Sequence, residues 1–164
     1  MRNVVLIGMP GAGKSTVGVV LAKILGFDFI DTDLIIQAKT KQKLYKFIEL
    51  YGTKAFLRTE NDCVKELRAE NCVIATGGSV VYGQEAMENL KAIGTVVYLK
   101  LPEPDIEERI TNLATRGIAM EEGQTLSDIY DERSPLYEKY ADITIESHGK
   151  TISQIAAEIA EKAV

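Results

Sequence analysis

Short apolar runs alternate with stretches of helical periodicity along most of the chain. A continuous apolar run, which is typical of a buried strand, lies at 3–8, and further strand candidates lie at 27–31, 72–78, 94–101 and 142–146. Helical patterns fill the segments 14–25, 33–70 with breaks near Thr40 and Gly52, 83–92, 103–112, 125–140 and 151–163. Strands separated by helices need crossover connections. The pattern therefore predicts a three-layer α/β/α fold with a parallel sheet covered on both faces.

The segment 112–124 departs from this regular alternation. Its sequence, NLATRGIAMEEGQ, has weak periodicity and contains two glycines, so we expect a mobile loop there. The chain has 164 residues and neither an internal repeat nor a low-complexity tract. This length suits one domain with a real core, and we expect 1–164 to form a single domain.

Composition narrows the class of protein. Apolar residues make up 46% and charged residues 26%, which is typical of a soluble globular protein, and the net charge of −5 argues against general nucleic-acid binding. Two cysteines and one histidine argue against a zinc site and favour a reduced, cytoplasmic compartment. We expect no signal peptide and no membrane span, because the N-terminus leads straight into a strand and no apolar run approaches ~18 residues.

The clearest motif is GMPGAGKST at 8–16, which matches G-x-x-x-x-G-K-[ST] between a predicted strand and a predicted helix. Glycines let backbone N–H groups surround phosphate oxygens, and the helix N-terminus favours negative charge. Lys14 supplies a cation to the β and γ phosphates, and the Ser15 hydroxyl is a ligand for Mg²⁺. The alternative is a glycine-rich turn with a chance lysine. The residues predicted to bind ATP in this motif are Gly11, Ala12, Gly13, Lys14, Ser15 and Thr16.

The rest of the chain indicates which kind of nucleotide protein this is. A regulatory GTPase needs Asn-Lys-x-Asp and D-x-x-G motifs, and neither occurs. A small-molecule kinase needs a second pocket and a closing lid that excludes water, and the chain has room for both.

Two acidic residues follow the second predicted strand. Asp31 and Asp33 lie at its carboxyl end, where ligands bind in open α/β sheets. Asp33 can accept a proton from an attacking hydroxyl, and Asp31 can organise Mg²⁺. The alternative is that both acids only begin a helix. TGGS at 76–79 ends another strand, where Gly77 and Gly78 permit close approach of a ligand or simply form a turn.

A carboxylate interrupts the apolar stripe of the helical segment around 53–62. Phe56, Leu57 and Val64 recur at helical spacing, and Glu60 lies on the same stripe. Arg58 falls one step off it, where an exposed pair with Asp62 is the simplest expectation.

Several segments resemble shikimate kinase in order and spacing over nearly the whole chain. They are LIGMPGAGKSTVGVVLAKILGFDFIDTD, AFLRTE, ATGGS, GTVVYL and RSPLYEKYAD. The resemblance implies a monomeric P-loop kinase of the nucleoside-monophosphate-kinase type, with a five-stranded parallel sheet in the order 2-3-1-4-5. It also implies transfer of the ATP γ-phosphoryl group to the 3-hydroxyl of shikimate in aromatic amino-acid biosynthesis.

The resemblance also implies roles for individual residues. Catalytic roles fall on Lys14, Asp33 and Arg116, and metal binding on Ser15 and Asp31. Arg109 resembles the arginine beside the adenine, and Arg116 the lid arginine that reaches the phosphates; otherwise Arg116 is a solvated loop charge. Acceptor binding falls in a region of about 33–62 and in later segments. The predicted acceptor residues are Asp33, Arg58, Glu60, Gly77, Gly78, Ser79 and Arg133. Without the family, Arg133 is a helix-surface charge.

Three departures from the family pattern fall on the acceptor side and the lid. Ser79 replaces a third glycine, Gly117-Ile118 replaces Pro-Leu in the lid, and Leu57 replaces the arginine that grips the shikimate carboxylate and pairs with the glutamate three residues on. Losing a buried arginine–carboxylate contact costs on the order of 2–5 kcal/mol. Two alternatives therefore stay open: a kinase of a related small hydroxylated metabolite, or a nucleotide-binding protein with weakened catalysis.

Overall fold

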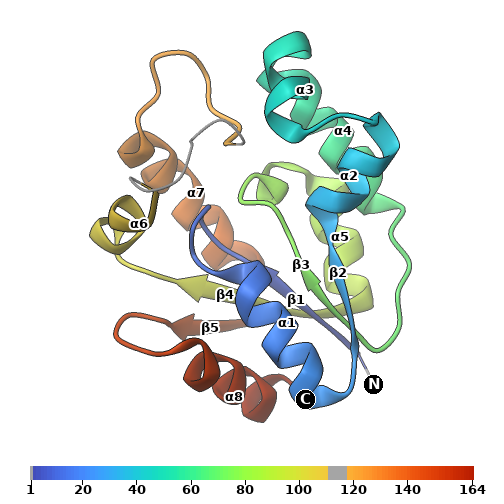
Figure 1. Ribbon diagram of the computed structural model, residues 1–164, viewed down its shortest axis with the longest axis vertical. Coiled ribbons are helices and arrows are strands. Elements are labelled where there is room, and N and C mark those ends of the chain that lie inside the picture. The colour runs from blue at the N-terminus through green and yellow to red at the C-terminus, as the bar shows by residue number, and fades with distance from the viewer. Residues whose placement is uncertain (1, 111–117) are drawn as a thin grey trace.

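A five-stranded parallel sheet forms the centre of the protein (Figure 1). The computed structural model describes residues 2–110 and 118–164. The strands are β1 (Asn3–Ile7), β2 (Asp28–Asp31), β3 (Cys72–Ala75), β4 (Gly94–Lys100) and β5 (Ile143–Glu146). Their order is β2-β3-β1-β4-β5, and every neighbouring pair is parallel. The predicted fold class and strand order are confirmed.

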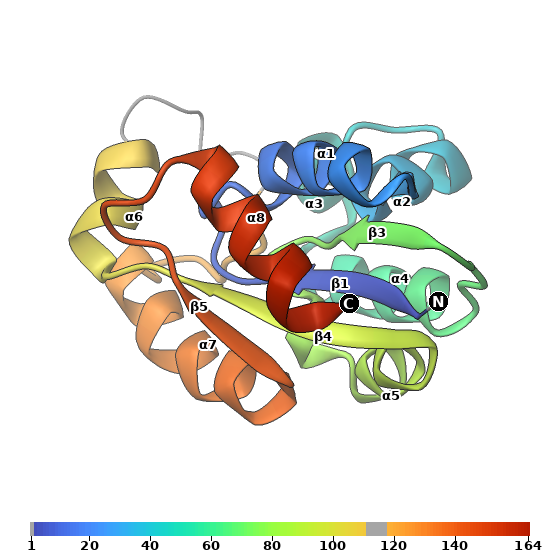
Figure 2. The ribbon, with the colours of Figure 1, turned by 90° about the horizontal axis from the view of Figure 1, so that it is seen from below.

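Helices cover both faces of this sheet (Figure 2). On one face lie α1 (Lys14–Leu25) and α8 (Ile152–Ala163), which pack against each other. The other face carries α4 (Thr53–Lys65), α5 (Gln84–Ile93) and α7 (Leu126–Tyr140). Shorter helices lie near the carboxyl ends of the strands: α2 (Thr32–Thr40), α3 (Leu44–Tyr51), α6 (Glu103–Ile110) and the 3₁₀ turn η1 (Val80–Tyr82). The two covering layers bury β1 completely, as its uninterrupted apolar sequence requires.

Local sequence explains where the helices begin and end. The long helical pattern of 33–70 divides because Lys41 adopts a left-handed conformation with φ 58° after α2, and Gly52, with φ 86°, separates α3 from α4. Thr125 and Thr151 open α7 and α8 with capping boxes, in which the threonine side chain accepts a bond from the helix backbone. The two breaks expected near Thr40 and Gly52 are confirmed.

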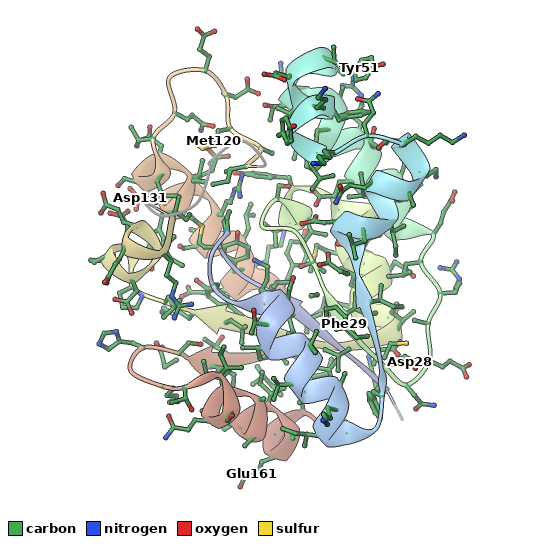
Figure 3. All side chains as sticks on the ribbon, viewed as in Figure 1. Asp28, Phe29, Tyr51, Met120, Asp131 and Glu161 are labelled. Atoms are coloured by element: carbon green, nitrogen blue, oxygen red, sulfur yellow. The ribbon has the colours of Figure 1, made fainter. Side chains whose placement is uncertain are left out.

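Charged side chains point outward from the two covering layers. Asp131 on α7 and Glu161 on α8 both extend into solvent at the edge of the molecule (Figure 3). Over the described ranges, none of the helices combines the length and apolar character that crossing a membrane requires.

Candidate active site

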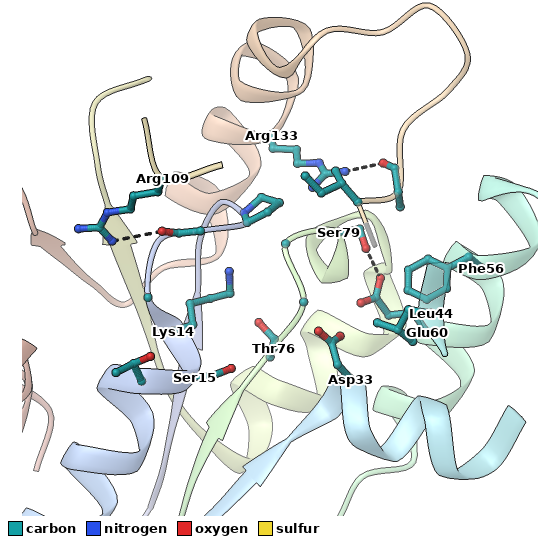
Figure 4. Close-up of a pocket in the computed structure, with 18 residues that line it drawn as sticks. Lys14, Ser15, Asp33, Leu44, Phe56, Glu60, Thr76, Ser79, Arg109 and Arg133 are labelled. Carbon is teal, nitrogen blue, oxygen red and sulfur yellow. Dashed lines mark hydrogen bonds between the residues drawn. The ribbon is translucent and has the colours of Figure 1, made fainter. Parts of the chain in front are cut away.

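A cavity of about 520 Å³ lies at the carboxyl edge of the sheet, between the loop after β1 and the helices α2, α4 and α7 (Figure 4). It brings together most of the predicted nucleotide-side and acceptor-side residues. Those that line it are Gly11, Gly13, Lys14, Ser15, Thr16, Asp33, Glu60, Gly77, Gly78, Ser79, Arg109 and Arg133. The convergence follows from the topology, because parallel strands place the loops after β1, β2 and β3 at one edge.

The loop before α1 turns its backbone toward this cavity. Gly13 has φ 94°, a left-handed conformation that favours glycine, and it leads directly into the first turn of α1. Lys14 is buried, and its Nζ donates to the carbonyl oxygens of Gly8 and Met9, at 2.8 Å each. Burial lowers the pKa of Lys14 to about 8, although the nearby Asp33 carboxylate opposes this shift. The ammonium group is thus held inside the loop beside the helix N-terminus.

Two other residues fix the outer part of this loop. Arg109 on α6 donates from Nη1 to the Gly11 carbonyl at 3.1 Å, and its guanidinium lies at the mouth of the cavity (Figure 4). Ala12 is buried and its backbone N–H donates to the Met9 carbonyl at 3.1 Å. Ala12 therefore holds the loop in shape and is not among the residues that line the cavity.

Ser15 and Asp31 lie side by side at the start of α1 and the end of β2. The Ser15 hydroxyl donates to Asp31 Oδ2 at 3.1 Å. The other oxygen of Asp31 accepts the backbone N–H of Asp33 at 2.9 Å and so caps α2. The capping interpretation of Asp31 is thus confirmed, and the same carboxylate also contacts the P-loop hydroxyl. No cluster of three or more His, Cys, Asp or Glu side chains suited to a metal occurs within 2–110 and 118–164.

Asp33, two residues further on, faces the centre of the cavity (Figure 4). Burial raises the pKa of its carboxyl group, the nearby Asp31 raises it further, and the Lys14 ammonium opposes both. A carboxylate whose pKa is raised is a stronger base than an ordinary aspartate and is therefore better suited to accept a proton from a hydroxyl.

Glu60 reaches the same cavity from α4. Its side chain is only 2% exposed, and Oε1 accepts a hydrogen bond from the Ser79 hydroxyl at 2.6 Å. Burial raises the pKa of Glu60 to about 7, while the Ser79 hydrogen bond favours the ionised form. The predicted position of Glu60 on the buried face of its helix is confirmed.

Arg133 is buried at 1% exposure on the inner side of α7, so the interpretation as a helix-surface charge is wrong. Its Nη2 donates to the Ala119 carbonyl at 2.7 Å, and its Nε donates to the Tyr82 hydroxyl at 3.3 Å. A Cβ atom placed on Gly78 would lie 3.1 Å from Nη1, so this part of the guanidinium borders the glycine turn. Tyr137, one turn along α7, donates to the Gly78 carbonyl at 2.6 Å.

Arg58 lies outside the cavity. Its side chain is exposed and borders a separate surface hollow with Leu57, Asn61 and Tyr82. α4 is a regular helix from Thr53 to Lys65, and Arg58 lies on its exposed face. The structure thus does not support the prediction that Arg58 binds the acceptor. The expected pair with Asp62 is also replaced, since Asp62 pairs with Lys65 at 3.1 Å.

Two predictions concern the segment 112–124, namely that it is a mobile loop and that Arg116 in it reaches the phosphates, and the residues 112–117 lie outside the described ranges. The later part of the segment is described, and Ile118 and Ala119 line the cavity. Thr53, at the start of α4, donates to the Met120 carbonyl at 2.9 Å, which ties this segment to the acceptor side.

Sequence reasoning missed several lining residues. They are Pro10, Leu44, Phe56, Thr76, Ile118 and Ala119. For Phe56, the apolar stripe that it shares with Glu60 was an available signal, because a face that carries a buried acid can also face a pocket. Leu44 and Ala119 offered no such signal, since only packing brings α3 and the segment after 117 over the cavity.

Comparison with known proteins agrees with this geometry. Residues 10–164 match the family model described as shikimate kinase. A shikimate kinase of Thermodesulfovibrio yellowstonii is 36% identical over 162 residues, which cover 97% of this chain and 93% of the relative.

Solved structures give the same assignment. The shikimate kinase of Acinetobacter baumannii in complex with shikimate superposes with a TM-score of 0.90 at 34% identity, over 99% of this chain and 92% of the other. That of Aquifex aeolicus gives 0.82 at 29% identity, over 98% and 96%. This chain belongs to the shikimate kinase family.

Proposed function

We propose that the protein is an ATP-dependent shikimate kinase, which transfers the γ-phosphoryl group of ATP to the 3-hydroxyl of shikimate. The observation that carries the proposal is the single cavity that joins the P-loop residues Lys14 and Ser15 to Asp33 and Arg133. Phosphoryl transfer needs the two substrates side by side with little covalent participation by the protein, and this cavity supplies an anion site beside an acceptor site.

On the nucleotide side, ATP would lie along the loop of 8–16 with its phosphates at the N-terminus of α1. Lys14 would exchange its bonds to the Gly8 and Met9 carbonyls for phosphate oxygens, which also favours its protonated form. Arg109, which lines the same cavity, would contact the nucleotide base. We extend the proposal to Arg116 as a further phosphate contact.

The residues at the start of α1 and the end of β2 fit Mg²⁺. Ser15 and Asp31 present oxygen ligands to one point, and Mg²⁺ prefers a few protein oxygens completed by water and phosphate. When bound, the ion would neutralise charge on the β and γ phosphates.

On the acceptor side, Asp33 would accept the proton of the attacking hydroxyl. The hydroxyl oxygen forms a bond to the γ-phosphorus, the bond between that phosphorus and the bridging oxygen breaks, and ADP leaves. Gly77 and Gly78 allow the acceptor to approach the backbone, and the Arg133 guanidinium supplies the cation for the acceptor carboxylate.

The test is acceptor-stimulated release of ADP from MgATP, with the product identified by phosphorus NMR. We expect shikimate to give turnover at a micromolar-to-millimolar KM, and Asp33→Asn to abolish it. Turnover with another hydroxy acid, an amino alcohol or a sugar, but not with shikimate, would indicate a related metabolite kinase. A lack of stimulation by every acceptor would indicate a nucleotide-binding protein with weakened catalysis.

The proposal includes a monomeric enzyme of a reduced cytoplasmic compartment, formed by one kinase domain. Its support is that Cys63 and Cys72 are free thiols, both buried in the core. Gel filtration of the reduced protein, in which we expect the mass of one chain, tests the oligomeric part.

A further inference from the structure

The two oxygens of the Glu60 carboxylate are in different situations. Oε1 accepts the Ser79 hydroxyl at 2.6 Å, whereas Oε2 is buried and has no hydrogen-bond partner within the described ranges 2–110 and 118–164. A buried carboxylate oxygen without a partner is destabilising, because it loses its water without compensation. A purely structural glutamate would be expected to satisfy both oxygens.

The unpartnered oxygen faces the cavity next to Asp33. A Cβ atom placed on Gly77 would lie 2.9 Å from Glu60 Oε2 and 2.9 Å from Asp33 Oδ1. The two carboxylates thus flank the same glycine, whose missing side chain keeps the space between them open (Figure 4). A small molecule with two neighbouring hydroxyl groups can donate to both oxygens at once.

Ser79 determines which oxygen is available. It is 5% exposed, lies at the start of η1, and its backbone has ordinary φ and ψ of −92° and 0°, so its position needs no glycine. Its hydroxyl binds Oε1 and thereby leaves Oε2 directed toward the acceptor space. The side chain at position 79 therefore fixes the rotation of the Glu60 carboxylate.

We propose that Ser79 is a positioning residue that holds Glu60 so that Oε2 accepts a hydrogen bond from a second hydroxyl of the acceptor, adjacent to the hydroxyl held by Asp33. The inference rests on the proposed function, and it deepens that function by assigning the recognition of the acceptor's neighbouring hydroxyls. It requires an acceptor that carries at least two adjacent hydroxyl groups.

The test compares shikimate with 4-deoxyshikimate and 5-deoxyshikimate. With the unaltered protein, we expect 4-deoxyshikimate, which lacks the hydroxyl next to the reacting 3-hydroxyl, to lose roughly 10- to 100-fold in kcat/KM, the range for a hydrogen bond to a charged group, and 5-deoxyshikimate to lose much less. With Glu60→Gln, we expect that penalty to shrink to within about 3-fold, while the KM for ATP stays unchanged. Glu66→Gln, an exposed change at the end of the same helix, should behave as the unaltered protein.

Ser79→Ala separates positioning from packing. We expect it to reduce the same analogue penalty partially and to move the acidic limb of the shikimate kcat/KM profile to higher pH, because the Ser79 hydroxyl favours the ionised form of Glu60. The charged groups that face Glu60 are Asp33, Lys14 and Arg133, and all of them remain in this variant. A merely structural disturbance would not shift this limb. Ser153→Ala, an exposed serine on α8, is the matched control.

Calorimetric binding of the three compounds gives a second readout that does not need turnover. A selective loss of binding by 4-deoxyshikimate that disappears in Glu60→Gln supports the inference even if shikimate is not phosphorylated, in which case only the proposed function fails. The inference is overturned if each analogue loses as much affinity in Glu60→Gln as in the unaltered protein. It is also overturned if Ser79→Ala leaves the acidic limb of the kcat/KM profile at the same pH.

Discussion

The nucleotide side and the acceptor side of the cavity are built in different ways. The nucleotide side comes mainly from one continuous segment, 8–16, whose backbone groups and helix N-terminus would carry the proposed phosphate contacts. The acceptor side gathers Asp33, Glu60, Ser79 and Arg133 from α2, α4, the turn before η1 and α7. Backbone contacts do not change with side-chain substitution, whereas a site made of side chains from four segments can be altered one residue at a time.

The departures from the family pattern illustrate this difference. The P-loop matches its motif in full, whereas the resemblance implies an arginine where this chain has Leu57 and a third glycine where it has Ser79. Ser79 now satisfies one oxygen of Glu60, the glutamate that stands three residues after Leu57. Two of the three departures that the resemblance implies therefore fall on the predicted acceptor side, and none falls in the phosphate loop.

The largest effect is expected on the nucleotide side. Lys14→Met removes the one buried cation of the P-loop, and we expect kcat to fall roughly 10²- to 10³-fold, as for loss of a single preorganised donor to the reacting group. Binding of shikimate should change little. Lys23→Met, an exposed lysine of the same helix, is the control for kinetics. If Lys14→Met reduced the affinity for shikimate by as large a factor as it reduced kcat, the nucleotide side and the acceptor side of the cavity would not act independently.

Next in size is the loss of the acceptor cation. Arg133→Met should raise the KM for shikimate roughly 100-fold, within the range for removing one member of a buried charge pair, with the KM for ATP within about 3-fold. Because Arg133 also holds the Ala119 carbonyl, thermal unfolding must be measured in parallel. Lys139→Met, exposed on the same helix, serves for comparison. An unchanged KM for shikimate would remove Arg133 from the acceptor site.

The third prediction concerns stability and pH. The pKa of Glu60 is raised from 4.5 to about 7 in the folded protein, so between these values the folded state binds more protons than the unfolded state. The free energy of unfolding should therefore fall as pH rises from about 4.5 to about 7, by on the order of 2 kcal/mol from this group. Urea unfolding across this range should show a weaker fall in Glu60→Gln than in the unaltered protein. Parallel curves for the two proteins would contradict the prediction.

The smallest effect is a gain. Leu57→Arg restores the family residue three positions before Glu60, and we expect kcat/KM for shikimate to rise by about 10-fold, which is less than the range for a fully buried contact because position 57 is only half-buried. Leu50→Arg, at an exposed position of α3, should have no effect. If Leu57→Arg leaves kcat/KM for shikimate unchanged, position 57 does not reach the acceptor. The pair of Glu60 and Ser79 then needs no arginine at position 57.

Much of the fold and of the phosphate site could be predicted from the sequence. The apolar runs and the helical segments between them located the strands, and G-x-x-x-x-G-K-[ST] in its strand–helix context located Lys14 and Ser15. These features are local, because a strand pattern, a glycine turn and a helix start each depend on neighbouring residues. Even the break at Gly52 could be read from a single residue.

The acceptor side could be predicted only in outline. The sequence placed Glu60 on a buried face but could not find its partner, because Ser79 lies 19 residues away on another segment. It assigned Arg58 to the acceptor, whereas the packing of α4 leaves that residue exposed. Without the family, Arg133 read as a surface charge, although α7 turns it inward against Ala119.

By itself, then, the sequence determined the parallel sheet, the phosphate loop and the set of acids and arginines available for the acceptor. Only the tertiary structure decided which of them meet. The rotation of α4 and α7 about their axes and the close approach of the turn at Gly77 depend on how distant apolar faces pack. That packing, and not local propensity, left one oxygen of Glu60 bonded to Ser79 and the other facing the acceptor space.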